Sequence, residues 1–300
     1  MLWYNQMLKM DFVLVIAEDQ VPFGRFRTAG ESGWRIGVAI GDQVLDLRAA
    51  GLIDHADMHR LMQVTPQERQ TLRQALSEGL RAGSTGQLAW EPVLLPQSAV
   101  ELGLPCEVGD YTDFYAGIHH ASEIGRQFRP DKSLLPNCKW VPIGYHGRAS
   151  TLQASGSSFH RPMGQSRAPD AAQPVLAPCA WLDIELELGI FIGQPNAQGV
   201  PVSMQAAEQH VFGITLFNDW SARDIQAWEY QPLGPFLSKN FASTVWPWIF
   251  RQTMSTRNGG CVSSWPGVSR TSRCRVSAVA MSWRWVRRSP SAQWPAQSGS

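Results

Sequence analysis

The clearest hydrophobic pattern in the chain lies at residues 181–193, WLDIELELGIFIG, where aliphatic and acidic positions alternate. A period of two predicts a β-strand with Asp183, Glu185 and Glu187 on one face and the aliphatic side chains on the other. Carboxylates so close together raise one another's pKa unless a cation neutralises their charge. The acidic face therefore either meets water or binds a cation, and this strand alone leaves both readings open.

Two patterns in the first hundred residues predict strands followed by helices. Within residues 13–48, Gly41 and Asp42 separate two apolar runs, which predicts a β-hairpin. Residues 54–83 then place apolar side chains at helical spacing, with Thr65 before a proline as the start signal and a glycine at the end. We therefore expect a small β-rich unit that continues into a helical segment.

Proline, glycine and charge divide the chain into three parts. Pro92 and Pro96 mark the passage into a region dense in glycine, proline and aromatic residues, which is typical of a β-rich domain that carries its chemistry on loops. The last fifty residues contain eight arginines but no leucine, acid or lysine, and they lack the periodicity of a core face. The expected parts are 1–100, an N-terminal domain with a helical linker; 101–250, the domain with the chemistry; and 251–300, an anomalous, disordered tail.

Composition and charge narrow the class of protein. The chain has 300 residues, 44% of them hydrophobic, enough to bury a substantial core. The arginines of the tail leave 18 basic against 25 acidic residues elsewhere, which argues against nucleic-acid binding. Five cysteines without a CxxC pair argue against a disulfide framework and a zinc site. The apolar run FVLVIA, residues 12–17, is too short to span a membrane. We expect a soluble, cytoplasmic protein that begins at Met1 or Met10.

Two further stretches carry candidate polar groups. Residues 110–129, DYTDFYAGIHHASEIGRQFR, predict a helix with Asp113 and His120 two turns apart on one face. These side chains would be a metal ligand and a general base, or else a helix-end acid and a surface histidine. In PIGYHGRAS, glycines surround a Tyr-His pair, so Tyr145 or Arg148 would hold an anionic substrate, or the segment is a plain turn.

A fourth stretch, FNDWSARDIQAWEYQPLGPFLSKNFAST, covers residues 217–244. It predicts a strand that delivers Asp219 at its end and a helix with Ser221 as its N-cap. An acid at that point is typical of a functional site, although a helix-capping role explains it as well. Lys239 lies in a loop with glycine and proline rather than on a solvated helix face, which favours a fixed position for this lysine.

Together these stretches resemble the fumarylacetoacetase (fumarylacetoacetate hydrolase) family. The motifs DYTDFY, GYHGRAS, RPMGQ, LDIELELG, NDWSARDIQAWEYQPLGPFLSK and FASTV are similar to the motif series of that family. The N-terminal VPFGRF and RIGVAIGDQVLDL resemble its small first domain. The resemblance implies a mainly β, α+β fold with an N-terminal SH3-like barrel and a mixed β-roll catalytic domain, C-terminally incomplete here, and a homodimer.

The resemblance also implies roles for individual residues. Four carboxylates would hold Ca²⁺ or Mg²⁺, with a lysine and a serine beside the ion: Asp113, Glu185, Glu187 and Asp219, with Lys239 and Ser243. The family usually has threonine at the serine position. The catalytic groups would be His120 as general base, Lys239 and Arg223. The substrate-binding residues would be Tyr115, Arg129, Tyr145, Gln226 and Tyr230.

The implied reaction is hydrolysis of a carbon–carbon bond of 4-fumarylacetoacetate to fumarate and acetoacetate, a step of tyrosine and phenylalanine catabolism. In that reaction the cation polarises the carbonyl and the histidine activates water. Two alternatives stay open: another superfamily activity (acylpyruvate hydrolase, decarboxylase or isomerase), and an inactive truncated or frameshifted product. The composition of residues 251–300, which is typical of out-of-frame translation, favours the second and predicts poor folding and little activity.

Overall fold

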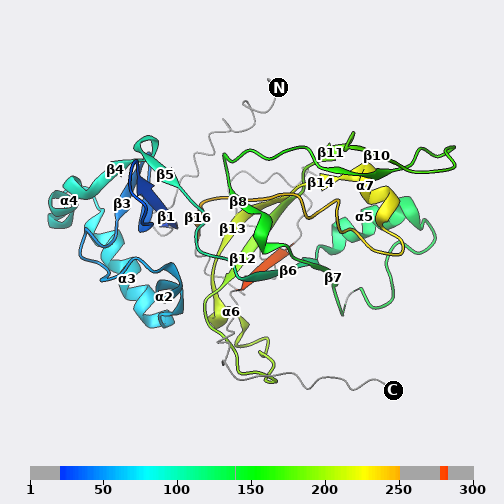
Figure 1. Ribbon diagram of the computed structural model, residues 1–300. Coiled ribbons are helices and arrows are strands. Elements are labelled where there is room, and N and C mark those ends of the chain that lie inside the picture. Colours follow the sequence, from blue (N-terminus) through cyan, green and yellow to red (C-terminus); the bar gives the residue numbers. More distant parts are fainter. Residues whose placement is uncertain (1–20, 139, 251–277, 283–300) are drawn as a thin grey trace, which may run out of the picture.

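A computed structural model describes residues 21–138 and 140–250 and the strand at 278–282. Its strands gather in two regions, a smaller one at the left of Figure 1 and a larger one at the right. The architecture is mainly β with a few helices, so the predicted α+β class is confirmed. Within the described residues, no helix combines the length and the apolar character that crossing a membrane requires.

The first sheet follows the order β16-β1-β2-β3-β4, and β5 also pairs with β1. Its strands are β1 (Phe23–Thr28), β2 (Arg35–Ile40), β3 (Gln43–Asp46), β4 (Leu94–Pro96), β5 (Val100–Leu102) and β16 (Trp248–Ile249). The predicted hairpin joins β2 to β3, with Gly41 at φ 57°, the left-handed conformation that a tight hairpin turn needs. Among the described strands the pairing path does not close, so the sheet is open and is not the predicted barrel.

Helices α2 (Met58–Gln63), α3 (Pro66–Gly79) and α4 (Thr85–Trp90) follow this hairpin. The start of α3 agrees with the sequence, because Thr65 and Glu68 form a capping box ahead of a proline in the first turn. The Thr65 side chain accepts from the Glu68 backbone N–H at 3.2 Å, and the Glu68 carboxylate accepts from the Thr65 N–H at 2.8 Å. This reciprocal pairing satisfies donors that a helix start leaves open. The turns η1 (Glu91–Val93) and η2 (Gln97–Ala99) flank β4.

The second sheet has the order β7-β6-β17-β12-β13-β15-β8. Its strands are β6 (Asp110–Tyr115), β7 (Ile143–His146), β8 (Leu152–Ala154), β12 (Leu186–Ile192), β13 (Val211–Asp219), β15 (Ser243–Val245) and β17 (Ala278–Ser282). The pairs β12–β17 and β15–β8 are parallel and the others are antiparallel, which makes the sheet mixed. The long β12–β13 ladder at its centre brings the end of β13 beside the start of β12.

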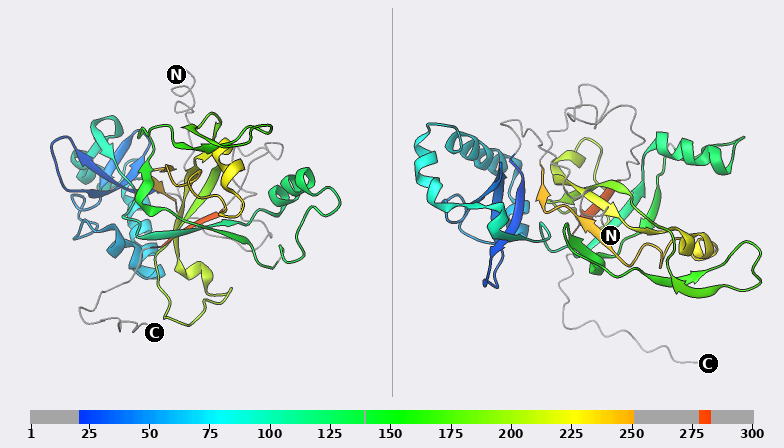
Figure 2. Two further views of the ribbon diagram at one scale, coloured as in Figure 1. Left: turned by 45° about the vertical axis from the view of Figure 1, so that its right-hand side comes forward. Right: turned by 90° about the horizontal axis from the view of Figure 1, so that it is seen from above.

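Shorter elements surround this sheet. They are η3 (Ala149–Thr151), the β9 (Met163–Ser166) and β10 (Val175–Pro178) ladder, the β11 (Leu182–Asp183) and β14 (Ser221–Ala222) pair, and the helices α5 (Ile118–Phe128), α6 (Ala207–His210) and α7 (Arg223–Glu229). Figure 2 shows α5 and the β9–β10 ladder extending from the end of the molecule opposite the first sheet.

A shared core joins the two regions. One buried cluster includes Leu45 from the first sheet and Phe191 and Phe217 from the second. The rings of Phe23 and Phe212 lie 6.0 Å apart across the junction. Because β16 pairs with β1 after the chain has passed through the second sheet, the first region is completed by residues distant in sequence.

The structure corrects two predicted helix starts. Residues 110–115 form strand β6, and α5 begins only at Ile118 after the N-cap position of Gly117. Asp113 and His120 therefore lie on a strand and a helix, not on one helix face. The aromatic residues of DYTDFY favour a strand. Ser221 does not cap α7, since its hydroxyl donates to the Asp219 carbonyl at 3.2 Å.

The strand predicted over residues 181–193 is interrupted. It forms as β11 and β12, and Ile184 and Glu185 lie between them. An aliphatic face is expected to be buried and an acidic face exposed, but here the burial is reversed: Leu186 is 46% exposed whereas Glu187 is 2% exposed. The acidic face thus points into the protein. Charged groups remain in such a place only with partners or in a neutral form.

Strand β17 falls within the part of the sequence expected to be a disordered tail. It pairs with β6 on one side and runs parallel to β12 on the other, inside the second sheet. The remainder of that part, 251–277 and 283–300, lies outside the described residues.

Candidate active site

A cavity of about 590 Å³ opens between the second sheet, α5 and α7. The residues to which the resemblance gives a role line it with two exceptions; those that line it are Asp113, Tyr115, His120, Tyr145, Glu185, Glu187, Asp219, Arg223, Gln226, Tyr230 and Lys239. A cavity of this size accommodates a small organic molecule. Residues separated by more than a hundred positions therefore meet in one place.

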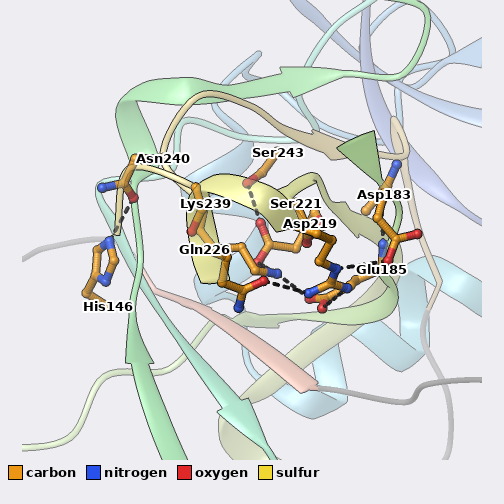
Figure 3. A network of polar contacts seen from close by, with 12 residues as sticks. His146, Asp183, Glu185, Asp219, Ser221, Gln226, Lys239, Asn240 and Ser243 are labelled. Atoms are coloured by element: carbon orange, nitrogen blue, oxygen red, sulfur yellow. Dashed lines mark hydrogen bonds and ion pairs between the residues drawn. The ribbon is translucent and has the colours of Figure 1, made fainter. Parts of the chain in front are cut away.

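Lys239 forms ion pairs with two members of the acidic group, Glu185 and Asp219, which are labelled with it in Figure 3. Its ammonium contacts the carboxylate of Glu185 and lies 3.0 Å from Asp219. Asp219 also accepts a 3.3 Å hydrogen bond from the hydroxyl of Ser243, its register neighbour on β15. Burial alone would lower the pKa of Lys239, but Asp219 and Glu185 outweigh it and raise that pKa. Lys239 is therefore held as a cation.

Arg223, the first residue of α7, extends its guanidinium to three acceptors. Its Nε donates to Asp183 at 2.9 Å, its Nη2 to Glu185 at 2.6 Å and its Nη1 to Gln226 at 2.9 Å. The planar fork fixes the direction of the side chain. Burial opposes ionisation of Glu185, yet Lys239 and Arg223 together outweigh it and lower the pKa of Glu185.

Asp113 and Glu187 differ from the paired carboxylates. Asp113 Oδ1 and Glu187 Oε2 are buried and have no hydrogen-bond partner. Burial first, and then the charge of Asp219, raises the pKa of Asp113 to about 7. Burial and the neighbouring carboxylates raise the pKa of Glu187 to about 9. Both side chains are thus costly as anions unless a positive charge approaches them.

These unsatisfied oxygens bear on whether a metal ion suits the site. Four carboxylates without a thiolate at the cavity wall are the donor chemistry of Ca²⁺ or Mg²⁺ rather than zinc. Among the described residues, however, no three acidic, histidine or cysteine side chains are gathered at metal-binding spacing. The donor set fits an oxygen-bound cation by its chemistry, and these side chains would have to converge further to hold one.

The cavity wall also carries an imidazole and phenols. His120 lies in the first turn of α5 and packs edge-on against Tyr115, with 5.0 Å between the ring centroids. Tyr145 on β7 is the register partner of Asp113 on β6. Burial, and then the charge of Asp113, raises the pKa of Tyr145. Its hydroxyl therefore stays a hydrogen-bond donor at neutral pH.

Three predicted residues do not line the cavity. Arg129 is exposed at the C-terminal end of α5. Ser243 is fully buried behind Asp219. The guanidinium of Arg148, a candidate for binding an anion, lies over the Phe236 ring at 5.8 Å from its centroid and is not part of the cavity wall.

Sequence reasoning gave no role to three groups that the structure brings to the site. Asp183 is a partner of Arg223, although the two residues are 40 positions apart. His146 lines the cavity, and its Nε2 lies 2.7 Å from Asn240 Oδ1, next to Lys239 (Figure 3). Ile124 gives the cavity an apolar contact. The motif GYHGRAS contained the histidine, but nothing local distinguished it from its neighbours.

Comparison with known proteins finds matches in one protein family. The family model described as "Fumarylacetoacetate (FAA) hydrolase C-terminal" matches residues 111–286, and the one described as "Fumarylacetoacetase N-terminal" matches residues 19–105. A fumarylacetoacetase of Caenorhabditis elegans is 44% identical over 248 residues, covering 76% of this chain and 59% of its own length. The human fumarylacetoacetase is 42% identical over 266 residues, covering 80% of this chain and 63% of its own length.

A solved structure, a fumarylacetoacetate hydrolase from Exiguobacterium antarcticum, is 18% identical with a TM-score of 0.42, covering 76% of this chain and 66% of that one. The chain spans about three fifths of the length of the two curated relatives above. The C-terminal family model, over residues 111–286, matches more than half of the chain. By that match, this chain belongs to the fumarylacetoacetate hydrolase family.

Proposed function

We propose that this protein hydrolyses a carbon–carbon bond of 4-fumarylacetoacetate and releases fumarate and acetoacetate. The observation that carries the proposal is the cavity itself, where two histidines and three tyrosines line the same space as a fixed lysine, a fixed arginine and four carboxylates. Two of the carboxylates are paired with Lys239, and two have unsatisfied oxygens. Such a division of charge suits a dicarboxylic β-diketone and an oxygen-bound cation.

The cation is part of the proposal. Asp113, Glu185, Glu187 and Asp219 would hold Ca²⁺ or Mg²⁺, because their oxygens are hard ligands. The unsatisfied oxygens of Asp113 and Glu187 support this assignment. When bound, the ion would act as a Lewis acid on a substrate carbonyl.

The residues of the chain would divide the remaining work. His120 would take a proton from water at an imidazole nitrogen as the water oxygen attacks the carbonyl carbon of the fumaryl group, the one attached to the carbon–carbon double bond. The carbon–carbon bond then breaks, and its electron pair leaves with the acetoacetate part as an enolate. Lys239 would stabilise the enolate oxygen, and His120 would return the proton to the enolate carbon. Water thereby supplies a hydroxyl to fumarate and a hydrogen to acetoacetate.

Substrate binding would depend on the groups around this centre. Tyr115, Tyr145, Gln226 and Tyr230 line the cavity and supply hydrogen-bonding groups for the carbonyl and carboxylate oxygens of the substrate. Arg223 would contribute positive charge beside Gln226. Arg129 lies outside the cavity wall, so its proposed role in substrate binding requires movement of the end of α5.

The names of the relatives, all fumarylacetoacetases, support a place in tyrosine and phenylalanine catabolism. A homodimer and a cytoplasmic location belong to the same proposal and await measurement. Sedimentation of the purified chain tests the dimer directly, since the protomer mass is 33.3 kDa.

The test of the function is an assay of the purified chain with 4-fumarylacetoacetate and added Ca²⁺ or Mg²⁺, with His120→Asn and Asp219→Asn as matched variants. We expect loss of substrate absorbance with the unaltered chain and little with either variant. A folded chain that leaves 4-fumarylacetoacetate intact but cleaves an acylpyruvate would redirect the assignment within the superfamily. A folded, cation-loaded chain that cleaves neither would overturn it in favour of an inactive product.

A further inference from the structure

A single carboxylate, that of Glu229, joins the last turn of α7 to the loop that follows it. It accepts hydrogen bonds from the backbone N–H of Phe236 at 2.7 Å, of Leu237 at 3.1 Å and of Ser238 at 2.9 Å. It also accepts one from the Ser238 hydroxyl at 2.5 Å. Hydrogen bonds to an ionised acceptor are about twice as strong as those to a neutral one. The backbone of three consecutive residues is therefore held from one point.

The loop held in this way leads directly into Lys239. The Lys239 backbone N–H donates to the Phe236 carbonyl at 3.1 Å, which closes the turn. The Ser238 carbonyl accepts from the Ala222 N–H at 2.9 Å, and Ser238 is fully buried. Because the turn fixes the start of the Lys239 side chain, it also fixes where the ammonium meets Asp219.

We propose that Glu229 is a positioning residue that holds Lys239 against the carboxylates of the cavity. Glu229 is not part of the cavity wall, so it acts through the turn and not by touching substrate. The role of Lys239 in hydrolysis rests on the proposed function, whereas its placement by Glu229 rests on the contacts alone. Helix α7 also carries Arg223 and Gln226, so the same carboxylate sets the spacing between those side chains and the lysine.

Other contacts to the loop act on different atoms. The Phe236 ring lies against the His146 imidazole, with 4.7 Å between centroids, and Asn240 contacts the same imidazole. These contacts hold side chains from the β7 side. Within the described residues, the hydrogen bonds to the backbone N–H groups of 236–238 come from Glu229. Removal of that carboxylate leaves those donors without their acceptor and loosens the turn.

Amine acylation of the full chain tests the placement of Lys239. The chain is treated with limiting acetic anhydride, and mass spectrometry gives the ratio of modification at Lys239 to that at Lys132, an exposed lysine. We expect strong protection of Lys239 in the unaltered chain and a ratio roughly tenfold higher in Glu229→Ala, which corresponds to about 1.4 kcal/mol of lost restraint. Glu229→Gln should give a smaller increase, because its amide keeps one acceptor oxygen.

Two controls separate positioning from general loosening. Glu208→Gln removes an exposed acid of α6 and should leave the ratio unchanged. The thiol of Cys106 is buried and should stay unreactive toward a disulfide reagent in every variant. If Glu229→Ala does not fold, Glu229→Gln carries the test. A ratio unchanged in the folded Glu229 variants, or raised equally in Glu208→Gln, would overturn the proposal.

Kinetics add a readout that separates this inference from the proposed function. With 4-fumarylacetoacetate we expect kcat to fall roughly tenfold in Glu229→Ala, with KM changed by less than about twofold, because Lys239 acts mainly on the developing enolate. If the unaltered chain hydrolyses nothing, the proposed function fails and the acylation ratio still decides the role of Glu229. Normal kcat in a Glu229 variant whose ratio has risen would overturn positioning of a catalytic lysine.

Discussion

Replacement of Glu187 by glutamine should stabilise the cation-free protein at alkaline pH and not at acidic pH. Glu187 is 2% exposed, and its Oε2 has no partner. Burial, followed by the charges of Asp113, Asp219 and Glu185, raises its pKa from 4.5 to about 9. A raised pKa means that the folded protein keeps a proton that the unfolded chain releases. The stability is therefore complete below the unfolded pKa and is lost as the pH rises toward the folded one.

The magnitude follows from the interval between the two pKa values. At pH 8, Glu187 is still protonated in the folded protein but ionised in the unfolded chain, where its pKa is 4.5. This difference lowers the free energy of unfolding by at most about 5 kcal/mol, at about 1.4 kcal/mol per pH unit. Glutamine avoids this cost but places an amide N–H₂ where no partner exists, which costs about 1–3 kcal/mol. With the larger amide cost, the net gain is about 2 kcal/mol at pH 8. At pH 5 the cost avoided is only about 1 kcal/mol, so the glutamine variant gains nothing there.

Thermal unfolding followed by circular dichroism in buffer with a chelator measures this difference. At pH 8 we expect the Tm of Glu187→Gln to exceed that of the unaltered chain by roughly 4–8 °C, and at pH 5 to equal it or fall below it. Glu208→Gln, an exposed control, should change neither. Equal Tm differences at the two pH values, or a Glu187→Gln variant that is less stable at pH 8, would contradict a raised pKa of Glu187 in the folded protein.

Three further substitutions probe other parts of the site and fold. His120→Asn should lower kcat by about 10²–10⁴-fold without changing Ca²⁺ affinity in a calorimetric titration; equal activity would remove His120 as the base. Asp183→Asn weakens the 2.9 Å contact with Arg223 at a side chain that is 34% exposed, so solvent limits the cost to at most about 1 kcal/mol. We expect KM to rise up to roughly fivefold with kcat retained, and a fall in kcat alone would contradict this. Gly193→Ala places a Cβ 2.4 Å from the Met62 carbonyl and should lower the free energy of unfolding by about 1–3 kcal/mol. An unchanged Tm would show that the backbone around Met62 and residue 193 moves apart without cost.

The sequence was most informative where a local pattern also decides the three-dimensional arrangement. Alternation at 181–193 placed Glu185 and Glu187 on one face, and both line the cavity. The same alternation does not say which face is buried. In the structure Leu186 is exposed and Glu187 is buried, because the acids face the cavity and the ion pairs of Lys239 and Arg223 rather than water.

Other features depend on contacts between distant segments. The helix predicted from residue 110 did not form there, because residues 110–115 pair with β7 and β17 as a strand. Local capping signals carry no information about such partners. The contact between Asp183 and Arg223 likewise joins two short elements, β11 and α7, and no spacing rule predicts it.

The most direct measurement of the central claim is hydrolysis of 4-fumarylacetoacetate in H₂¹⁸O by the purified, cation-loaded chain, with mass spectrometry of the products at short times. The proposed reaction gives equal amounts of fumarate and acetoacetate, with one ¹⁸O in the new carboxylate of fumarate and no label in acetoacetate above the enzyme-free exchange control. Label in the acetoacetate carboxylate, or an isomerised substrate without cleavage, would contradict it.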